Sequence, residues 1–226
     1  MAETKSLKEQ NAWLIRAAMI AHIAAFAWIA LEPGKLIKFG SVDIANKLET
    51  IAIPGSASLG LIVIASLLLL GLIPPLWRDR IIHLRWKHPL PGSRAFTEVG
   101  PQSNHIDMKR LSANLGGLPT APAEQNQIFY RLYSPLRDDV GVCDAHRRYL
   151  AARDIGTISF ILIIPLPILS IIATNNFQRA FFYSLSLLII YFLCCLSAKN
   201  YSWRMVQHVL ALSAIKEPTI TASPMP

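Results

Sequence analysis

An all-α membrane protein is the fold class that this sequence predicts, as a four-helix transmembrane bundle with a small helical cytoplasmic subdomain between spans 2 and 3. Three observations predict it. Of the 226 residues, 53% are hydrophobic and only 16% are charged, whereas soluble domains carry about a quarter charged residues. Four apolar stretches each have the roughly 20 residues that a helix needs to cross a bilayer. The basic residues are concentrated at one side of these stretches.

The predicted spans cover residues 14–31, 59–77, 155–173 and 180–198, each boundary being approximate. Helices are expected there because a helix pairs its own backbone groups, whereas an open sheet edge in lipid leaves them without partners. The first stretch lacks a small-residue cleavage pattern, so we expect it to be retained rather than removed as a signal peptide.

These spans predict three parts of the chain. The first is a transmembrane helix pair, the second is the cytoplasmic helical subdomain, and the third is another transmembrane pair with a cytoplasmic tail. Their limits are residues 1–77, 78–154 and 155–226.

Positive charge predicts the orientation. Of the 22 Lys and Arg residues, 18 lie in the two ends, counting Arg16 at the start of the first span, and in the long connection 78–153, and only 4 lie in the other two connections. Cytoplasmic connections carry an excess of Lys and Arg, so both termini and the long connection are expected to be cytoplasmic. The expected location is the plasma membrane, which in a bacterium is the inner membrane.

The first span has two notable features. Ala17, Ala21 and Ala24 form a stripe of small residues, which lets helices approach closely and predicts packing within or between chains. His22 is the ionisable group well inside the span. Such a group is either a structural hydrogen-bonding residue or part of a transport pathway.

Prolines interrupt the third span. Pro165 and Pro167 lie near its middle, and proline removes a backbone donor and clashes with the preceding turn. We expect a kink that serves packing. A hinge or gate of a small transporter is the alternative.

The long connection predicts three pieces. The helix of the second span is expected to continue from Trp77 to about Lys87, followed by a Pro-rich connector. A second helix is expected to be capped by Thr120 and to end before Pro135. A third is expected to begin near Asp138 and to continue into the third span.

Cations at the ends of this connection are predicted contacts of a partner or of lipid headgroups. A polybasic segment next to a membrane gains about 1 kcal/mol per cation from anionic lipid. The residues are Arg78, Arg80, Arg85, Lys87, Arg147, Arg148 and Arg153.

Catalysis is not predicted. His146 could act as acid or base with Asp144 or Asp139, with Arg147 and Arg148 holding a phosphate. However, His146 and Asp144 are two residues apart, which places them on different faces of a helix, and Asp144 is spaced to pair with Arg148.

Nucleotide-loop, His-Glu-x-x-His and Gly-x-Ser-x-Gly motifs are absent from the sequence, and its three cysteines form no Cys-x-x-Cys pair. No catalytic, cofactor-binding or metal-binding residue is therefore predicted. A basic and aromatic stretch around Trp86 is better explained by a nearby membrane than by direct binding of nucleic acid.

The function predicted from these features is that of a non-enzymatic, self-associating membrane protein. Its cytoplasmic subdomain would bind a partner or signal, and its helices would act as a membrane scaffold or permeability effector. By analogy, such proteins occur in bacterial stress and antiviral systems. The alternatives are a lipid-modifying enzyme that uses His146 with nearby Asp and Arg residues, and a small transporter that uses His22.

Overall fold

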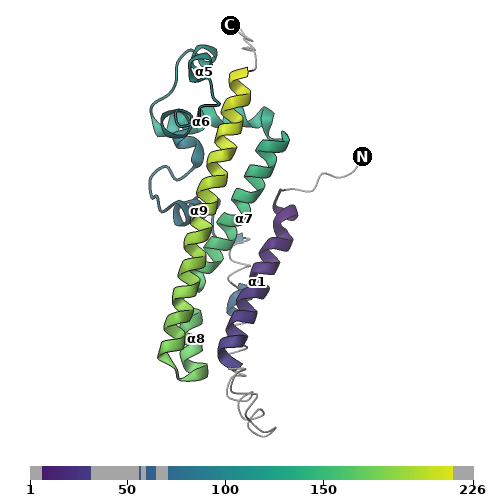
Figure 1. Ribbon diagram of the computed structural model, residues 1–226, viewed down its shortest axis with the longest axis vertical. Coiled ribbons are helices and arrows are strands. Elements are labelled where there is room, and N and C mark those ends of the chain that lie inside the picture. The colour runs from purple at the N-terminus through teal and green to yellow at the C-terminus, as the bar shows by residue number, and fades with distance from the viewer. Residues whose placement is uncertain (1–6, 32–55, 57–59, 65–70, 216–226) are drawn as a thin grey trace, which may run out of the picture. The chain divides into compact units, whose positions relative to one another are not determined.

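A computed structural model describes residues 7–31, 56, 60–64 and 71–215, and within these residues all regular structure is helical (Figure 1). The prediction of an all-helical protein is confirmed for this part of the chain. The α-helices are α1 (Leu7–Leu31), α4 (Pro75–His83), α5 (Met108–Leu115), α6 (Pro122–Tyr133), α7 (Val140–Leu162), α8 (Pro165–Thr174) and α9 (Phe177–Ile215).

Two of these helices, α1 and α9, are long and apolar enough to cross a membrane. A third candidate is the pair α7 and α8, which bends by 47° at the break between Leu162 and Pro165. The predicted second span falls partly on residue 59 and residues 65–70, outside the described residues. The number of four spans therefore stays a prediction.

Local sequence explains the turn between α8 and α9. Pro165 occupies the first turn of α8, where its missing N–H leaves no bond unmade. At the other end Asn175 adopts the left-handed conformation, and its N–H donates to the carbonyl of Ile171 at 2.7 Å. Asn176 then caps α9 by accepting from the backbone N–H of Arg179 at 3.1 Å.

The contacts divide the chain into two compact units. Unit 1 contains Met1–Ile82 and Leu150–Ser197, and unit 2 contains His83–Tyr149 and Ala198–Pro226. Helices α7 and α9 each contribute residues to both units. The predicted parts 1–77, 78–154 and 155–226 were defined by the side of the membrane on which each part lies. That division stays a prediction.

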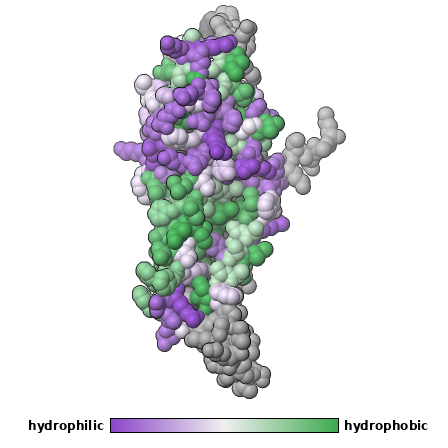
Figure 2. Space-filling view, viewed as in Figure 1, coloured by the Kyte–Doolittle hydropathy of each residue, from purple (hydrophilic) through white to green (hydrophobic). Residues whose placement is uncertain are grey.

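Unit 1 has an apolar core between α1, α7, α8 and α9. Its buried members include Phe26, Ile158, Leu162, Leu166 and Leu187. In unit 1, hydrophobic side chains also gather on the outer surface of α8 and α9 (Figure 2). Exposed apolar surface of this extent is what a lipid-facing helix presents, because lipid and not water is then its solvent.

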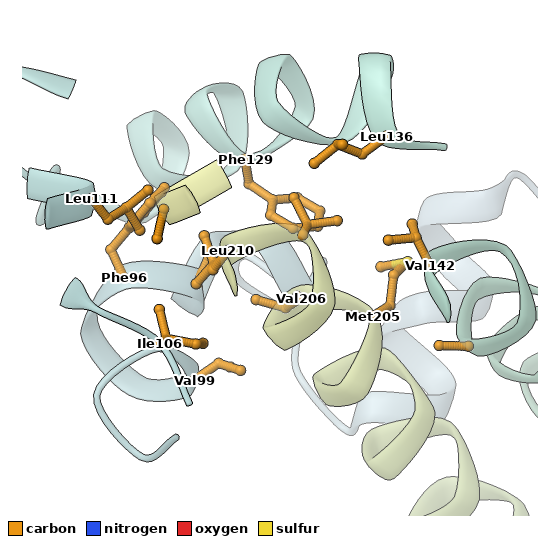
Figure 3. Close-up of a cluster of buried hydrophobic side chains, with 14 residues drawn as sticks. Phe96, Val99, Ile106, Leu111, Phe129, Leu136, Val142, Met205, Val206 and Leu210 are labelled. Atoms are coloured by element: carbon orange, nitrogen blue, oxygen red, sulfur yellow. The ribbon is translucent and has the colours of Figure 1, made fainter. Parts of the chain in front are cut away.

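Unit 2 has a separate core (Figure 3). Val206, Val209 and Leu210, which the sequence pattern places on one face, are fully buried there. They pack with residues of the long connection, among them Phe96 and Phe129. Residues 198–215 are thus the central helix of unit 2. The other members labelled in the figure are Val99, Ile106, Leu111, Leu136, Val142 and Met205.

Two predicted helix limits are wrong. Helix α4 ends at His83 and not near Lys87, because Leu84 turns the chain with a φ of 51°. Helix α6 is capped by Ala121 and not by Thr120, and Ala121 makes no side-chain cap hydrogen bond.

A buried glutamine organises the segment before α5. This segment forms a 3-10 turn, Pro91–Arg94, and then a π-helical turn, Ala95–Val99. Gln125 of α6 accepts from the backbone N–H of Phe96 at 3.1 Å and of Thr97 at 3.3 Å. Its amide nitrogen donates to the carbonyl of Thr120 at 2.8 Å. A single side chain thereby pairs backbone groups from two segments.

Candidate functional site

Two of the predicted contact residues, Arg78 and Arg153, lie in a buried ion-pair network of unit 1. Arg78 Nη1 lies 3.2 Å from Asp154 Oδ1, and Arg153 Nε lies 3.0 Å from the same oxygen. Arg153 Nη1 lies 3.4 Å from Asp79 Oδ1. Arg78 Nε also donates to the carbonyl of Ile73 at 3.0 Å. We call Arg78, Asp79, Arg153 and Asp154 the buried charge network.

All four members are at most 8% exposed. Burial of charge is costly unless each ion is paired and hydrogen-bonded, and here two cations face two anions. The network joins α4 to α7 within unit 1. Asp79 and Asp154 were not among the predicted contact residues, although each directly follows one of the two arginines.

The other predicted cations differ in their surroundings. Arg85 and Lys87 are exposed in unit 2. In unit 1, the guanidinium carbon of Arg80 lies 4.7 Å from the centre of the Trp77 ring, a distance typical of a cation–π contact.

Arg147 and Arg148 share one carboxylate in unit 2. Arg147 Nη2 lies 2.9 Å from Asp144 Oδ1, and Arg148 Nε lies 2.8 Å from Asp144 Oδ2. The hydrogen bond from Arg147, with that from Arg148, lowers the pKa of Asp144 below its usual value. Asp144 is thus an ion-pair partner of the arginines.

Residues of α9 extend this cationic surface. The guanidinium carbons of Arg148 and Arg204 lie 5.7 Å and 5.8 Å from the centre of the Tyr201 ring. Lys199 Nζ lies 5.0 Å from the centre of the Trp203 ring. The interaction with Tyr201 is the main reason that the pKa of Arg148 is raised. Lys199 and Trp203 each lie two residues from Tyr201, which places them on another face of α9. We call Arg147, Arg148, Tyr201 and Arg204 the cation–aromatic patch.

His146 has a tyrosine as its hydrogen-bond partner. Its Nδ1 lies 2.7 Å from the hydroxyl of Tyr133, and burial raises the pKa of that hydroxyl. The rings of His83, Tyr149 and His146 stack in a row, with centroids 5.8 Å and 6.3 Å apart. A tyrosine–histidine pair can exchange a proton, whereas Asp144 is paired with Arg147 and Arg148.

His22 and the alanine stripe lie on different faces of α1. His22 is 5% exposed, and its Nε2 lies 3.3 Å from the hydroxyl of Ser159 in α7. Ser159 also donates to the carbonyl of Ile155 at 3.1 Å. Ala17, Ala21 and Ala24 are exposed.

Among the residues that the structure describes, no three His, Cys, Asp or Glu side chains gather as a metal site requires. The chain matches no protein-family model, no curated protein sequence and no solved structure. Its function is therefore inferred from its own residues.

Proposed function

We propose that this chain is a non-enzymatic, self-associating multi-pass membrane protein whose helical unit 2 binds a cytoplasmic partner or signal. The observation that supports this most is how its charged groups are used. Asp79, Asp154 and Asp144 each pair with arginine, and His146 contacts a tyrosine. Unit 2 also has a hydrophobic core of its own, so it is a folded module with a fixed surface.

The proposed topology has four spans, with both termini and unit 2 in the cytoplasm at the plasma membrane. The distribution of Lys and Arg supports it. Asn104 is exposed in unit 2, so a cysteine there, in a variant lacking the three native cysteines, tests the topology. We expect a membrane-impermeant maleimide to label Asn104→Cys only in broken cells. Labelling in intact cells would overturn the orientation.

Self-association is proposed through α1, because the alanine stripe faces outward in a single chain while His22 and Phe26 face the core. The test is the mass of the assembly in mild detergent. Ala21→Leu should shift it towards the monomer, whereas Ile20→Leu, at an exposed position on the same helix, should not. A monomeric wild-type chain would refute self-association.

Partner binding is tested by purification in mild detergent and identification of a protein that accompanies the chain in a fixed ratio. Because Arg85 and Lys87 are exposed cations of unit 2, the double variant Arg85→Glu/Lys87→Glu should lose that protein. Arg131→Glu, at another exposed cation of unit 2, is the matched control. Equal recovery of the accompanying protein with both variants would show that Arg85 and Lys87 are not part of the contact.

An enzyme that acts on lipid is the second candidate, favoured by the 2.7 Å contact between Tyr133 and His146. It predicts that His146→Ala abolishes turnover and leaves assembly intact. Loss of the partner or of the oligomer in this variant would instead favour binding.

Permeation is tested in reconstituted liposomes. A permeability effector should release a small dye or ions when the partner or signal is added, and vesicles that stay tight would exclude it. A transporter should show saturable uptake that His22→Ala abolishes.

A further inference from the structure

The cation–aromatic patch carries net positive charge on an exposed surface. It contains three cations, and Asp144 pairs with two of them. Arg204 is exposed, and the side chains of Arg147 and Arg148 are 38% and 52% exposed. Three cations beside this carboxylate give a surface suited to a ligand with negative charge.

Two helices bring this charge to one point. Arg148 comes from α7 and Arg204 from α9, and both guanidinium groups lie within 6 Å of the ring centre of Tyr201. Asp144 further fixes the direction of Arg148 through the 2.8 Å hydrogen bond at Nε. Side chains held in this way lose less conformational entropy when a ligand binds than free surface arginines do.

Distance along the two helices indicates which anion the patch meets. Arg204 lies six residues beyond residue 198, where the apolar run of α9 ends, and Arg148 lies seven residues before Ile155, where the apolar run of α7 begins. At 1.5 Å per residue, each arginine is about 10 Å from an apolar run. The headgroup layer starts where the hydrocarbon ends, and long arginine side chains reach into it.

The aromatic residues agree with this depth. Tyrosine and tryptophan are enriched where hydrocarbon meets water, because one part of the ring system is apolar and the other polar. Tyr201 and Trp203 follow the apolar run of α9 within five residues, and each lies under a cation.

We propose that the cation–aromatic patch binds the phosphate headgroup of an anionic phospholipid through Arg148 and Arg204, the two arginines that contact the ring of Tyr201. The guanidinium groups donate to phosphate oxygens, for which their planar fork is suited.

The test uses the full chain purified in a neutral detergent, with phosphatidylglycerol and phosphatidylcholine as probes. Apparent dissociation constants are obtained from the lipid-bound fraction in native mass spectra. We expect phosphatidylglycerol to bind at least tenfold more tightly. A cation near anionic lipid contributes about a fivefold change in affinity. The variant Arg148→Gln/Arg204→Gln should therefore weaken the binding of phosphatidylglycerol about thirtyfold and leave the binding of phosphatidylcholine unchanged.

Matched variants separate this site from general charge. Arg131 and Arg137 are exposed in unit 2 outside the patch, so Arg131→Gln/Arg137→Gln should bind phosphatidylglycerol as the wild type does. Arg148→Lys/Arg204→Lys keeps the charge and loses the planar fork, so its affinity for phosphatidylglycerol should lie between those of the wild type and the glutamine double variant. If the glutamine double variant fails to fold, Arg204→Gln alone should weaken binding about fivefold.

Several outcomes would overturn the lipid site. They are equal binding of the two lipids, an equal loss in the Arg131→Gln/Arg137→Gln control, and displacement of phosphatidylglycerol by excess inorganic phosphate or by a short RNA. Because this site needs the proposed membrane embedding, the same samples are tested for extraction from membranes by alkaline carbonate. A chain that is extracted refutes the proposed function, whereas an embedded chain without lipid selectivity refutes the lipid site alone.

Discussion

Arg78 and Asp154 form an ion pair between residues 76 positions apart in the chain, with 3.2 Å between Nη1 and Oδ1. Asp154 also holds Arg153, and Arg153 in turn contacts Asp79. The pairing fixes α4 against α7 in unit 1. It also explains why two arginines next to an apolar segment are almost fully buried.

Asp154→Asn should destabilise unit 1 strongly. The change removes one of two carboxylates that face two buried guanidinium groups, and an unpaired buried charge costs about 3 to 5 kcal/mol. The free energy of unfolding in detergent micelles is the measurement. Arg16→Gln, at an exposed cation of α1, should change it little.

A double-mutant cycle tests whether the effect comes from pairing. Arg78→Gln/Asp154→Asn removes both charges, so its loss of stability should be smaller than the sum of the two single losses. Additive losses would mean that the two side chains do not interact.

Gln125→Ala should destabilise unit 2 by about 1 to 3 kcal/mol. The variant leaves the N–H groups of Phe96 and Thr97 without their acceptor, and a polar group buried without a partner has a cost of this size. Thermal unfolding followed by circular dichroism measures it. Gln127 is exposed on the same helix, so Gln127→Ala should unfold at the same temperature as the wild type. Equal shifts of the melting temperature in the two variants would contradict the role of Gln125.

Gly156→Ala should disturb the packing of α7 in unit 1. A Cβ at this position would clash with the side chain of Ile82 and would lie 2.7 Å from Cβ of Cys194. Overpacking of a close contact costs about 1 to 3 kcal/mol. Gly71→Ala, where a Cβ meets nothing within 4 Å, is the control, and a fully stable Gly156→Ala would show that α7 can move away from its neighbours.

The stability that Asp144 contributes should depend on pH in one direction. Its pKa in the folded protein lies below the usual 3.8, so its ion pairs stabilise the fold above that value and are lost as the pH falls through the folded pKa. The difference in melting temperature between wild type and Asp144→Asn should therefore be constant near neutral pH and disappear in acid. A difference that persists in acid would show that the carboxylate charge is not its source.

Helix starts that depend on neighbouring residues were predicted from the sequence. The start of α7 is one example: it was predicted near Asp138, and Asp139 accepts from the N–H of Gly141 at 3.0 Å. Pro122 in the first turn of α6 is another, because proline there needs no distant partner, although the cap is Ala121 and not Thr120. Helix α4 ended early because the left-handed turn at Leu84 has no glycine to signal it.

Distant pairing was beyond the reach of the sequence pattern. The charge rule that assigns sides of a membrane counts Lys and Arg and gives little weight to Asp. Arg78 and Arg153 were therefore predicted to contact lipid headgroups or a partner, and no role was predicted for Asp79. The acceptor role of Gln125 depends on a segment 29 residues earlier. Tyr201 and Arg204 belong to the candidate site because α9 brings Tyr201 against Arg148 of α7 within unit 2.

The buried charge network has a consequence for how the protein responds to voltage. Two arginines and two aspartates sum to zero, and an electric potential across a bilayer acts on net charge, with about 2.3 kcal/mol per elementary charge for each 100 mV. In the proposed topology, the four groups therefore contribute no gating charge as long as they move together. A change of potential then does no net work on this junction, because the work on its two cations cancels the work on its two anions.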